Sequence, residues 1–156
     1  VRVCAMGHVT RAAAAVLCDA EGRVLLVRKA DARHRWGLPG AHIDPSQAPA
    51  HAVVRELRRE TGIEARVVDL LGLYLLCGHL RGDEEDLPDL LTYAFRCELV
   101  SGEPVLNGRG RIDHLGWYDA GCLPERITAT AAAVVTDCAG TRSGVVRTLT
   151  RDLALA

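Results

Sequence analysis

A single helical pattern, Pro49 to Thr61, lies between two groups of β-compatible runs and limits the folds open to this chain. Pro49 suits the first turn of a helix, because its missing N–H would have no partner there. Val53 and Leu57 are four residues apart and are predicted to face the core. Gly62 follows where a positive φ commonly ends a helix. A helix between strand groups is typical of an α/β domain with helices packed on a mixed sheet.

The other elements are predicted from apolar runs and turn signals. Residues 11–18 and 23–29 are β-compatible, and the turn Asp19-Ala20-Glu21-Gly22 between them predicts a hairpin. Asp44 or Ser46 is expected to cap the helix. Further expected elements are a loop over 33–44 that could include a short strand, strands over 65–77 (bent or bulged at Gly72), 90–100 and 115–119, a helix over 123–140, and a segment of ambiguous structure over 141–156.

The composition suits one compact domain, which we expect to comprise residues 1–156 with a core over about residues 10–140. The 19 basic side chains nearly balance the 20 acidic ones, so no overall basic charge points to nucleic acid. No apolar run reaches the roughly 18 residues that span a bilayer. The six cysteines lack metal-ligand spacing and are expected to be free thiols. A cytoplasmic location is the expectation, and the oligomeric state is left open, a homodimer included.

Two carboxylates on the predicted helix are the first candidates for chemistry. Glu56 and Glu60 are four residues apart, so they share one face of the helix. By spacing alone a solvated face is favoured, because Glu–Arg pairs at this spacing are ordinary and contribute only about 0.2–0.5 kcal/mol each. The same two carboxylates, with a carbonyl from the nearby Gly-rich loop, would also suit a hard cation such as Mg²⁺.

Two segments lie in order around this helix, Leu38-Pro39-Gly40 before it and RELRRETGI at 55–63 at its end. Their order resembles the Nudix hydrolase family. The family signature is Gly, five residues, Glu, seven residues, and then Arg-Glu-apolar-x-Glu-Glu-x-Gly-apolar. The chain matches it through Leu38-Pro39-Gly40 and through residues 55–63, RELRRETGI. The preceding VLLVRKA and Trp36, and the later GWYDAGCLPE, also look like family features, so the resemblance covers about residues 10–138. It implies an α/β/α sandwich with a mixed β-sheet.

The resemblance also implies roles for the residues that match. Glu56 and Glu60 would hold one or more Mg²⁺ or Mn²⁺ ions, which grip a diphosphate and help to activate the attacking water. The carbonyl of Gly40 often adds a metal bond in the family, and Arg55 would orient the glutamates. The implied substrate is a small nucleoside diphosphate derivative, and the implied reaction is hydrolysis of its diphosphate linkage.

Three positions of the signature differ in this chain. Ala41 stands for the glycine, Gln47 for the first glutamate, and Arg59 for the first of the paired glutamates. Gln47 can still accept a hydrogen bond from Arg55, without charge assistance. Arg59 has three interpretations, of which the first is slightly favoured: it turns to solvent, it pairs with Glu56 and suppresses metal binding, or it binds substrate phosphate in place of a second ion.

An acidic group from a later loop often completes such sites in the family. Here Arg111 or His114 stands where the glutamate is frequent, and Asp113 is close to both. The run Asp83-Glu84-Glu85-Asp86 is a second candidate, although a solvated loop is the simpler interpretation of it.

The sequence therefore predicts a Nudix-type hydrolase, with two alternatives. The altered signature favours a catalytically weak or inactive domain that binds a nucleotide-like ligand, and a protein-interaction domain is the third class. Recognition in this fold lies in loops, here 31–37, 79–89 and 101–114, which carry no substrate-specific signature.

Overall fold

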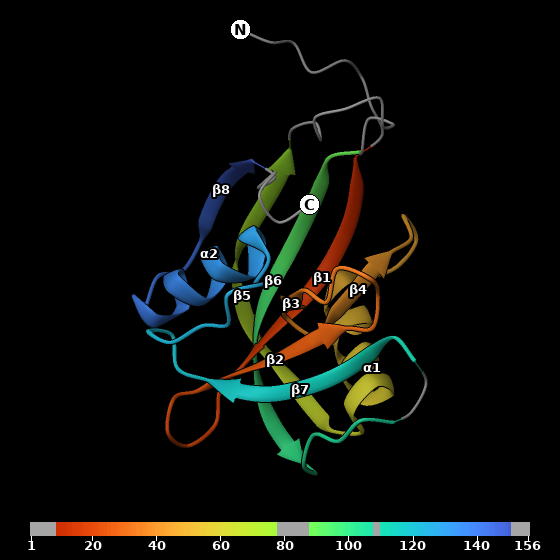
Figure 1. Cartoon of the computed structure of the whole chain (residues 1–156). Helices are drawn as coiled ribbons and strands as arrows, with labels where there is room; N and C mark the ends of the chain where they lie inside the picture. Colours follow the sequence, from red (N-terminus) through yellow and green to blue (C-terminus); the bar gives the residue numbers. More distant parts are fainter. Residues whose placement is uncertain (1–8, 78–87, 108–109, 151–156) are drawn as a thin grey trace, which may run out of the picture.

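The computed structural model describes residues 9–77, 88–107 and 110–150 (Figure 1). The elements in chain order are β1 (Thr10–Leu17), β2 (Val24–Lys29), β3 (Trp36–Gly37), β4 (Gly40–Ile43), α1 (Pro49–Thr61), β5 (Glu64–Cys77), β6 (Leu90–Ser101), β7 (Ile112–Tyr118), α2 (Ala129–Ala139) and β8 (Val145–Thr150). One sheet has the strand order β4-β1-β6-β5-β8, and the other has the order β3-β2-β7. The β1–β6 and β5–β8 pairs are parallel and the other pairs antiparallel, so the predicted mixed sheet is confirmed.

The predicted hairpin between the first two strands is wrong. The turn forms as expected, with Asp19 accepting hydrogen bonds from the backbone N–H groups of Glu21 and Arg23. Beyond one bridge between Cys18 and Val24, however, the strands separate into different sheets. Four consecutive residues of β2 are buried, Val24 to Val27, and β1 is similarly buried over its second half. Continuous burial marks strands covered on both faces, whereas a surface hairpin alternates.

Helix α1 has the predicted bounds, and Gly62 ends it with φ 76°. The predicted cap is wrong, because the N-cap is Ala48, whose side chain makes no capping bond. Pro49 in the first turn removes one N–H donor that a cap would otherwise satisfy.

The second helix begins at Ala129, six residues later than predicted. Thr128 is its N-cap and accepts a hydrogen bond from Ala131 N at 3.3 Å. The preceding residues form a turn and a single bridge to β3 instead, because Trp36 exchanges backbone hydrogen bonds with Arg126 O at 2.8 Å and Thr128 N at 2.9 Å. This pairing holds residues 124–126 beside β3.

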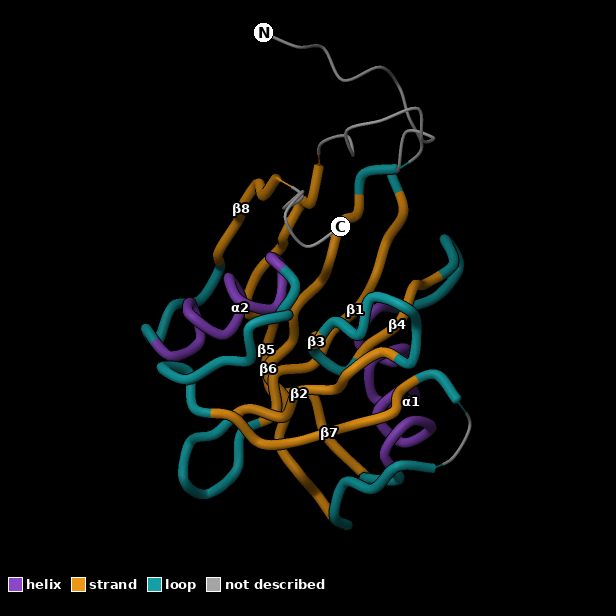
Figure 2. The backbone as a smooth tube through the Cα atoms, in the orientation of Figure 1, coloured by secondary structure: helices purple, strands orange, loops and turns teal. Residues whose placement is uncertain are grey.

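Two hydrophobic clusters give the molecule its layers. Val53 and Leu57 of α1 pack with Leu25 of β2 in one cluster, and Val134 and Leu26 belong to the other. Strand β2 contributes to both because successive side chains point to opposite faces. Helices α1 and α2 accordingly lie on opposite sides of the strands, as Figure 2 shows. The predicted α/β/α sandwich is confirmed.

The chain after α2 returns to the sheet as β8, which resolves the ambiguous segment 141–156 in part. β8 pairs with β5 from Gly72 onward. A Cβ on Gly72 would lie 2.4 Å from Val145 O, so only glycine allows this approach. The β5–β6 register shifts between Leu70 and Gly72, so the predicted irregularity is confirmed. Asp137 of α2 ties β8 down through two bonds from Arg147, at 2.5 and 2.6 Å.

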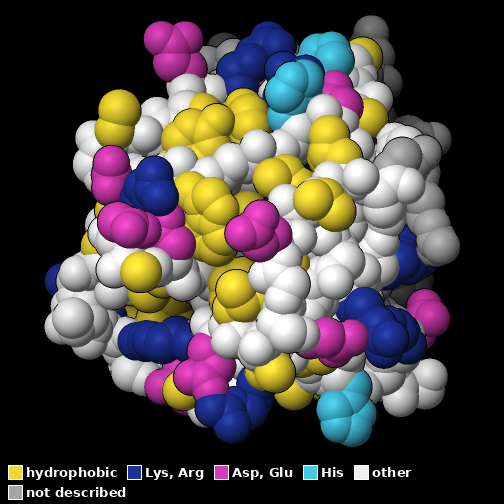
Figure 3. All heavy atoms as spheres, turned by 90° about the horizontal axis from the view of Figure 1, so that it is seen from below, with side chains coloured by type: hydrophobic (Ala, Val, Ile, Leu, Met, Phe, Trp, Pro, Cys, Tyr) yellow, Lys and Arg dark blue, Asp and Glu magenta, His cyan; other side chains and the backbone are white. Residues whose placement is uncertain are grey.

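The surface carries no single sign of charge on the face seen from below, where hydrophobic side chains gather around one central acidic side chain and both signs of charge lie farther out (Figure 3). Within the described ranges, no helix is long and apolar enough to cross a membrane. The described cysteines are free thiols, as predicted: Cys18, Cys77, Cys97, Cys122 and Cys138.

Candidate active site

The two helix carboxylates are buried rather than solvated. Glu56 is 5% exposed and Glu60 is 7% exposed, so the solvated-face interpretation is wrong. Burial, and after it the neighbouring Glu56, raises the pKa of Glu60 to about 8. The Oε2 atom of Glu60 has no hydrogen-bond partner within the described structure. Buried polar atoms are usually paired, so this oxygen marks a place where a cation or a polar group of a ligand would bind.

Two arginines lie against Glu56. Arg59 Nη2 donates to Glu56 Oε1 at 3.0 Å, so the favoured expectation that Arg59 turns away to solvent is wrong. Arg111 Nη1 lies 3.8 Å from the same oxygen. Arg111 therefore occupies the position from which the resemblance implied an acidic group. Two guanidinium groups converge on one carboxylate, one at a signature position of a glutamate and one in the later segment where the family often has an acidic group.

The other signature positions are arranged as follows. Gln47 Oε1 accepts a hydrogen bond from Asp44 N at 2.8 Å, which closes the turn before α1. Arg55 is exposed, and no hydrogen bond or ion pair with a described residue is found for it, so its orienting role stays a prediction. A Cβ on Gly40 would lie 2.2 Å from Ala13 O, so glycine is required where β4 meets β1. Ala41 is a strand residue that pairs with Ala13, and the substitution for glycine costs no strain because its φ is not positive.

The carboxylate pair fits one divalent ion. Within the described ranges no group of three or more His, Cys, Asp or Glu side chains could hold a metal. Mg²⁺ nevertheless binds proteins through one or two carboxylates and completes its shell with waters and substrate phosphates. The partnerless Glu60 Oε2 beside Glu56 meets that requirement. The run Asp83-Glu84-Glu85-Asp86 lies outside the described residues.

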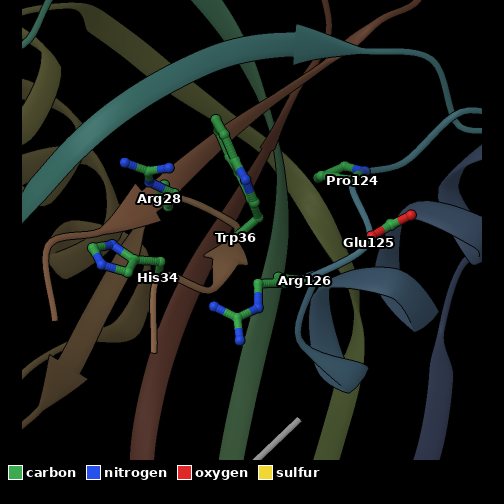
Figure 4. Close-up of a pocket in the computed structure, with 6 residues that line it drawn as sticks. All are labelled: Arg28, His34, Trp36, Pro124, Glu125 and Arg126. Carbon is green, nitrogen blue, oxygen red and sulfur yellow. The ribbon is translucent and has the colours of Figure 1, made fainter. Parts of the chain in front are cut away.

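A pocket of about 440 Å³ opens between β2, β3 and the segment before α2 (Figure 4). Arg28 and His34 lie on one side of the Trp36 indole, and Pro124 and Glu125 lie on the other. Arg126, the sixth lining residue, donates to Arg33 O at 3.1 Å. The Trp36 ring packs edge-on against Tyr118 with centroids 5.1 Å apart, which fixes the indole in the wall. Guanidinium, carboxylate and aromatic groups together suit a planar polar ligand.

Asp113 pairs with Arg28 of the pocket and lies beside His114. Arg28 binds it through two bonds, Nε to Oδ1 at 2.8 Å and Nη2 to Oδ2 at 3.0 Å. These bonds hold the pKa of Asp113 well below its usual range, and His114 lowers it further. Asp113 therefore serves Arg28 rather than the carboxylate site, and His114 Nδ1 lies 3.2 Å from it.

The sequence interpretation named the recognition loop 31–37, which contributes His34 and Trp36 to the pocket, but it missed the segment 124–126. The pocket residues come from 28–36 and 124–126, segments that only the pairing of Trp36 with residues 126–128 brings together. Reading Thr128 as an N-cap would have shortened the predicted helix and freed that segment, but nothing in the sequence indicated its partner.

Fold and site together define an α/β/α domain with a buried carboxylate pair on its first helix. A family model described as the NUDIX domain matches residues 8–138. The chain therefore belongs to the Nudix family.

Individual relatives agree with this assignment. The chain is 38% identical over 89 residues to a MutT-like protein of Streptomyces ambofaciens, covering 57% of this chain and 51% of the relative. It is 35% identical over 91 residues to an RNA pyrophosphohydrolase of Acidiphilium cryptum (strain JF-5), covering 56% of this chain and 46% of the relative. The chain thus spans about half the length of these relatives.

A NUDIX hydrolase structure from Nitrosomonas europaea superposes with a TM-score of 0.72. The two chains are 20% identical, and the match covers 88% of this chain and 93% of the other. At that identity the likeness concerns the fold alone.

Proposed function

We propose that this chain is a divalent-metal-dependent hydrolase that cleaves the diphosphate linkage of a nucleoside diphosphate derivative. The observation that carries the proposal is the buried, partnerless Oε2 of Glu60 beside Glu56, on the helix that bears the family signature. One relative supports the reaction class, since it is described as an RNA pyrophosphohydrolase.

Glu56 and Glu60 would hold Mg²⁺ or Mn²⁺, with the carbonyl of Gly40 as a further proposed oxygen. When bound, the ion supplies Lewis-acid chemistry at the phosphate oxygens. Both carboxylates are buried, so bulk water has little access to them. One of the two carboxylates also accepts the proton of the attacking water, which is the role of a general base.

The pocket is proposed to bind the group that the diphosphate carries. Trp36 offers a rigid aromatic wall, while Arg126 and Glu125 offer a donor and an acceptor of hydrogen bonds. A nucleobase has both a flat face and mixed donors and acceptors on its edge, so a nucleoside fits this lining.

The test is a panel of nucleoside diphosphate derivatives incubated with Mg²⁺ or Mn²⁺ and scored for phosphate-containing products. Glu60→Gln should lower turnover about a hundredfold or more, the loss typical of a removed acid–base or charge-stabilising group. Glu64→Gln is the matched control, because the Glu64 side chain is 44% exposed and pairs with Arg58 at 2.9 Å. Turnover by Glu60→Gln at the wild-type rate would contradict the assignment.

A second function is favoured by one observation, the two guanidinium groups on Glu56. They could occupy the metal position and leave a domain that only binds nucleotide-like ligands. In that case no substrate of the panel turns over, yet one raises the melting temperature, because a ligand that binds the folded state stabilises it.

A further inference from the structure

We propose that Arg59 and Arg111 form a phosphate clamp that binds the diphosphate group of the substrate directly, with no ion between guanidinium and phosphate. The clamp rests on the hydrolase function proposed above, because it would hold the same substrate. The clamp would give a function to Arg59 and Arg111, which stand where the family has acidic groups.

The two arginines reach one point from separate parts of the chain. Arg59 projects from the last turn of α1, and Arg111 precedes β7. Both guanidinium groups approach Glu56 Oε1, at 3.0 and 3.8 Å. The shared carboxylate sets their spacing, so the clamp is already assembled before a ligand arrives, which lowers the entropic cost of binding.

A ligand would meet the guanidinium groups before it meets the carboxylates. The side chains of Arg59 and Arg111 are 39% and 65% exposed, whereas that of Glu56 is 6% exposed. A guanidinium has five N–H donors, and Arg59 uses one of them in its described bond to Glu56. The remaining donors of the planar fork match the oxygens of a phosphate.

The end of α1 is held firmly enough to position Arg59. Val105 N donates to Thr61 O at 3.0 Å, and the Asn107 amide donates to the carbonyl of Arg59 itself. A cation in the last turn is also stabilised by the negative end of the helix dipole.

The clamp is connected to the pocket through the segment that leads into β7. Arg111 is two residues before Asp113, whose partner Arg28 lines the pocket. Ala30 follows β2, which carries Arg28, and its N–H donates to Arg111 O at 3.1 Å. A substrate could therefore place its diphosphate at the clamp and its nucleoside beside Trp36.

The clamp can be tested without catalysis, by titrating inorganic pyrophosphate into the full chain in the presence of EDTA. Calorimetry should detect binding to the wild type. Arg59→Gln and Arg111→Gln should each weaken it by about tenfold or more, the value of a lost charge-assisted hydrogen bond.

Arg58→Gln is the matched control, because Arg58 is the adjacent residue and pairs with Glu64 rather than Glu56. It should bind pyrophosphate within about twofold of the wild type, since it leaves the clamp intact. Arg59→Lys keeps the charge but loses the fork, so it should fall between wild type and Arg59→Gln. Melting temperatures verify that each variant is folded.

Absence of metal-free binding by the wild type would overturn the clamp, as would Arg59→Gln and Arg111→Gln variants that bind as tightly as Arg58→Gln. Failure of the clamp and failure of the hydrolase function give different results. A chain that turns over substrate with Mg²⁺ but does not bind pyrophosphate in EDTA loses only the clamp. A chain that binds pyrophosphate but turns over nothing loses the hydrolase function.

Discussion

Arg59 decides the electrostatics of the carboxylate site more than any other residue of α1. A glutamate there would make three acidic groups on one helical face, whereas arginine leaves two and adds a cation that pairs with one of them. Arg111 adds a second cation at the same oxygen. The site therefore needs fewer metal ions to balance the charge of a bound diphosphate.

Replacing Arg59 by glutamate tests this balance through turnover. Because the clamp binds phosphate, Arg59→Glu should lower Mg²⁺-dependent turnover by about tenfold or more, while Arg58→Glu should change it little. Initial rates at several Mg²⁺ concentrations provide the measurement. A large gain in turnover would instead show that Arg59 suppresses metal binding by occupying Glu56.

Sequence spacing predicts the position of some single residues but not of others. The shared face of Glu56 and Glu60 and the positive φ of Gly62 follow from helix geometry, and the structure shows both. The direction of Arg59 does not follow, since its long side chain reaches either solvent or Glu56. The pocket lining was not predictable either, because it depends on contacts between distant segments.

At the scale of elements, α1 was predictable because its start, apolar face and end all carry local signals. The partners of β1 and β2 were not. A turn shows only that the chain reverses direction. The partners of a strand depend on which other strands pair with its two edges. Here β4 and β6 flank β1.

The tie between α2 and β8 depends on one buried carboxylate. Asp137 accepts two bonds from Arg147 and one from Tyr74 Oη at 2.9 Å. Asp137→Asn should lower the free energy of unfolding by about 2–3 kcal/mol at pH 7, because it weakens bonds to a charged partner. Urea denaturation measures the change, and Arg142→Gln, on an exposed arginine 4.0 Å from Asp137, is the control.

The same variant has a defined pH dependence. Arg147, and after it Tyr74, lowers the pKa of Asp137 from 3.8. A lowered pKa stabilises the fold above the unfolded value, and the contribution is lost as the pH falls through the folded value. The stability difference between wild type and Asp137→Asn should therefore be full at pH 7 and shrink below about pH 4. If the stability difference stayed constant down to pH 3, it would come from packing and not from the charge of Asp137.

Strand β8 also depends on the missing side chain at position 72. Gly72→Ala places a Cβ against Val145 O, a backbone atom that cannot move without shifting β8, and should cost about 2–3 kcal/mol. Gly121→Ala is the control, because nothing lies within 4 Å of its added Cβ and its φ is not positive. Chemical denaturation of both variants checks the prediction; equal stabilities would show that β8 adapts freely.

For the whole molecule, the question is whether the two sheets unfold together. β2 belongs to the three-stranded sheet, yet Leu25 packs with Val53 and Leu57 of α1. Its neighbours Val24 and Leu26 pack in the opposite cluster with Val134 of α2. The smaller sheet therefore cannot separate without exposing both cores, so we predict that the described part of the chain is one cooperative unit.

Two spectroscopic probes report on different parts of this unit. Both tryptophans, Trp36 and Trp117, lie in the three-stranded sheet, so their fluorescence follows that sheet. Far-UV circular dichroism follows mainly α1 and α2, which flank the strands on opposite sides. If the clusters couple the sheets, urea transitions by the two signals should have the same midpoint. A fluorescence transition at lower urea would mean that β3, β2 and β7 unfold first, and that the shared side chains of β2 do not unite the two cores.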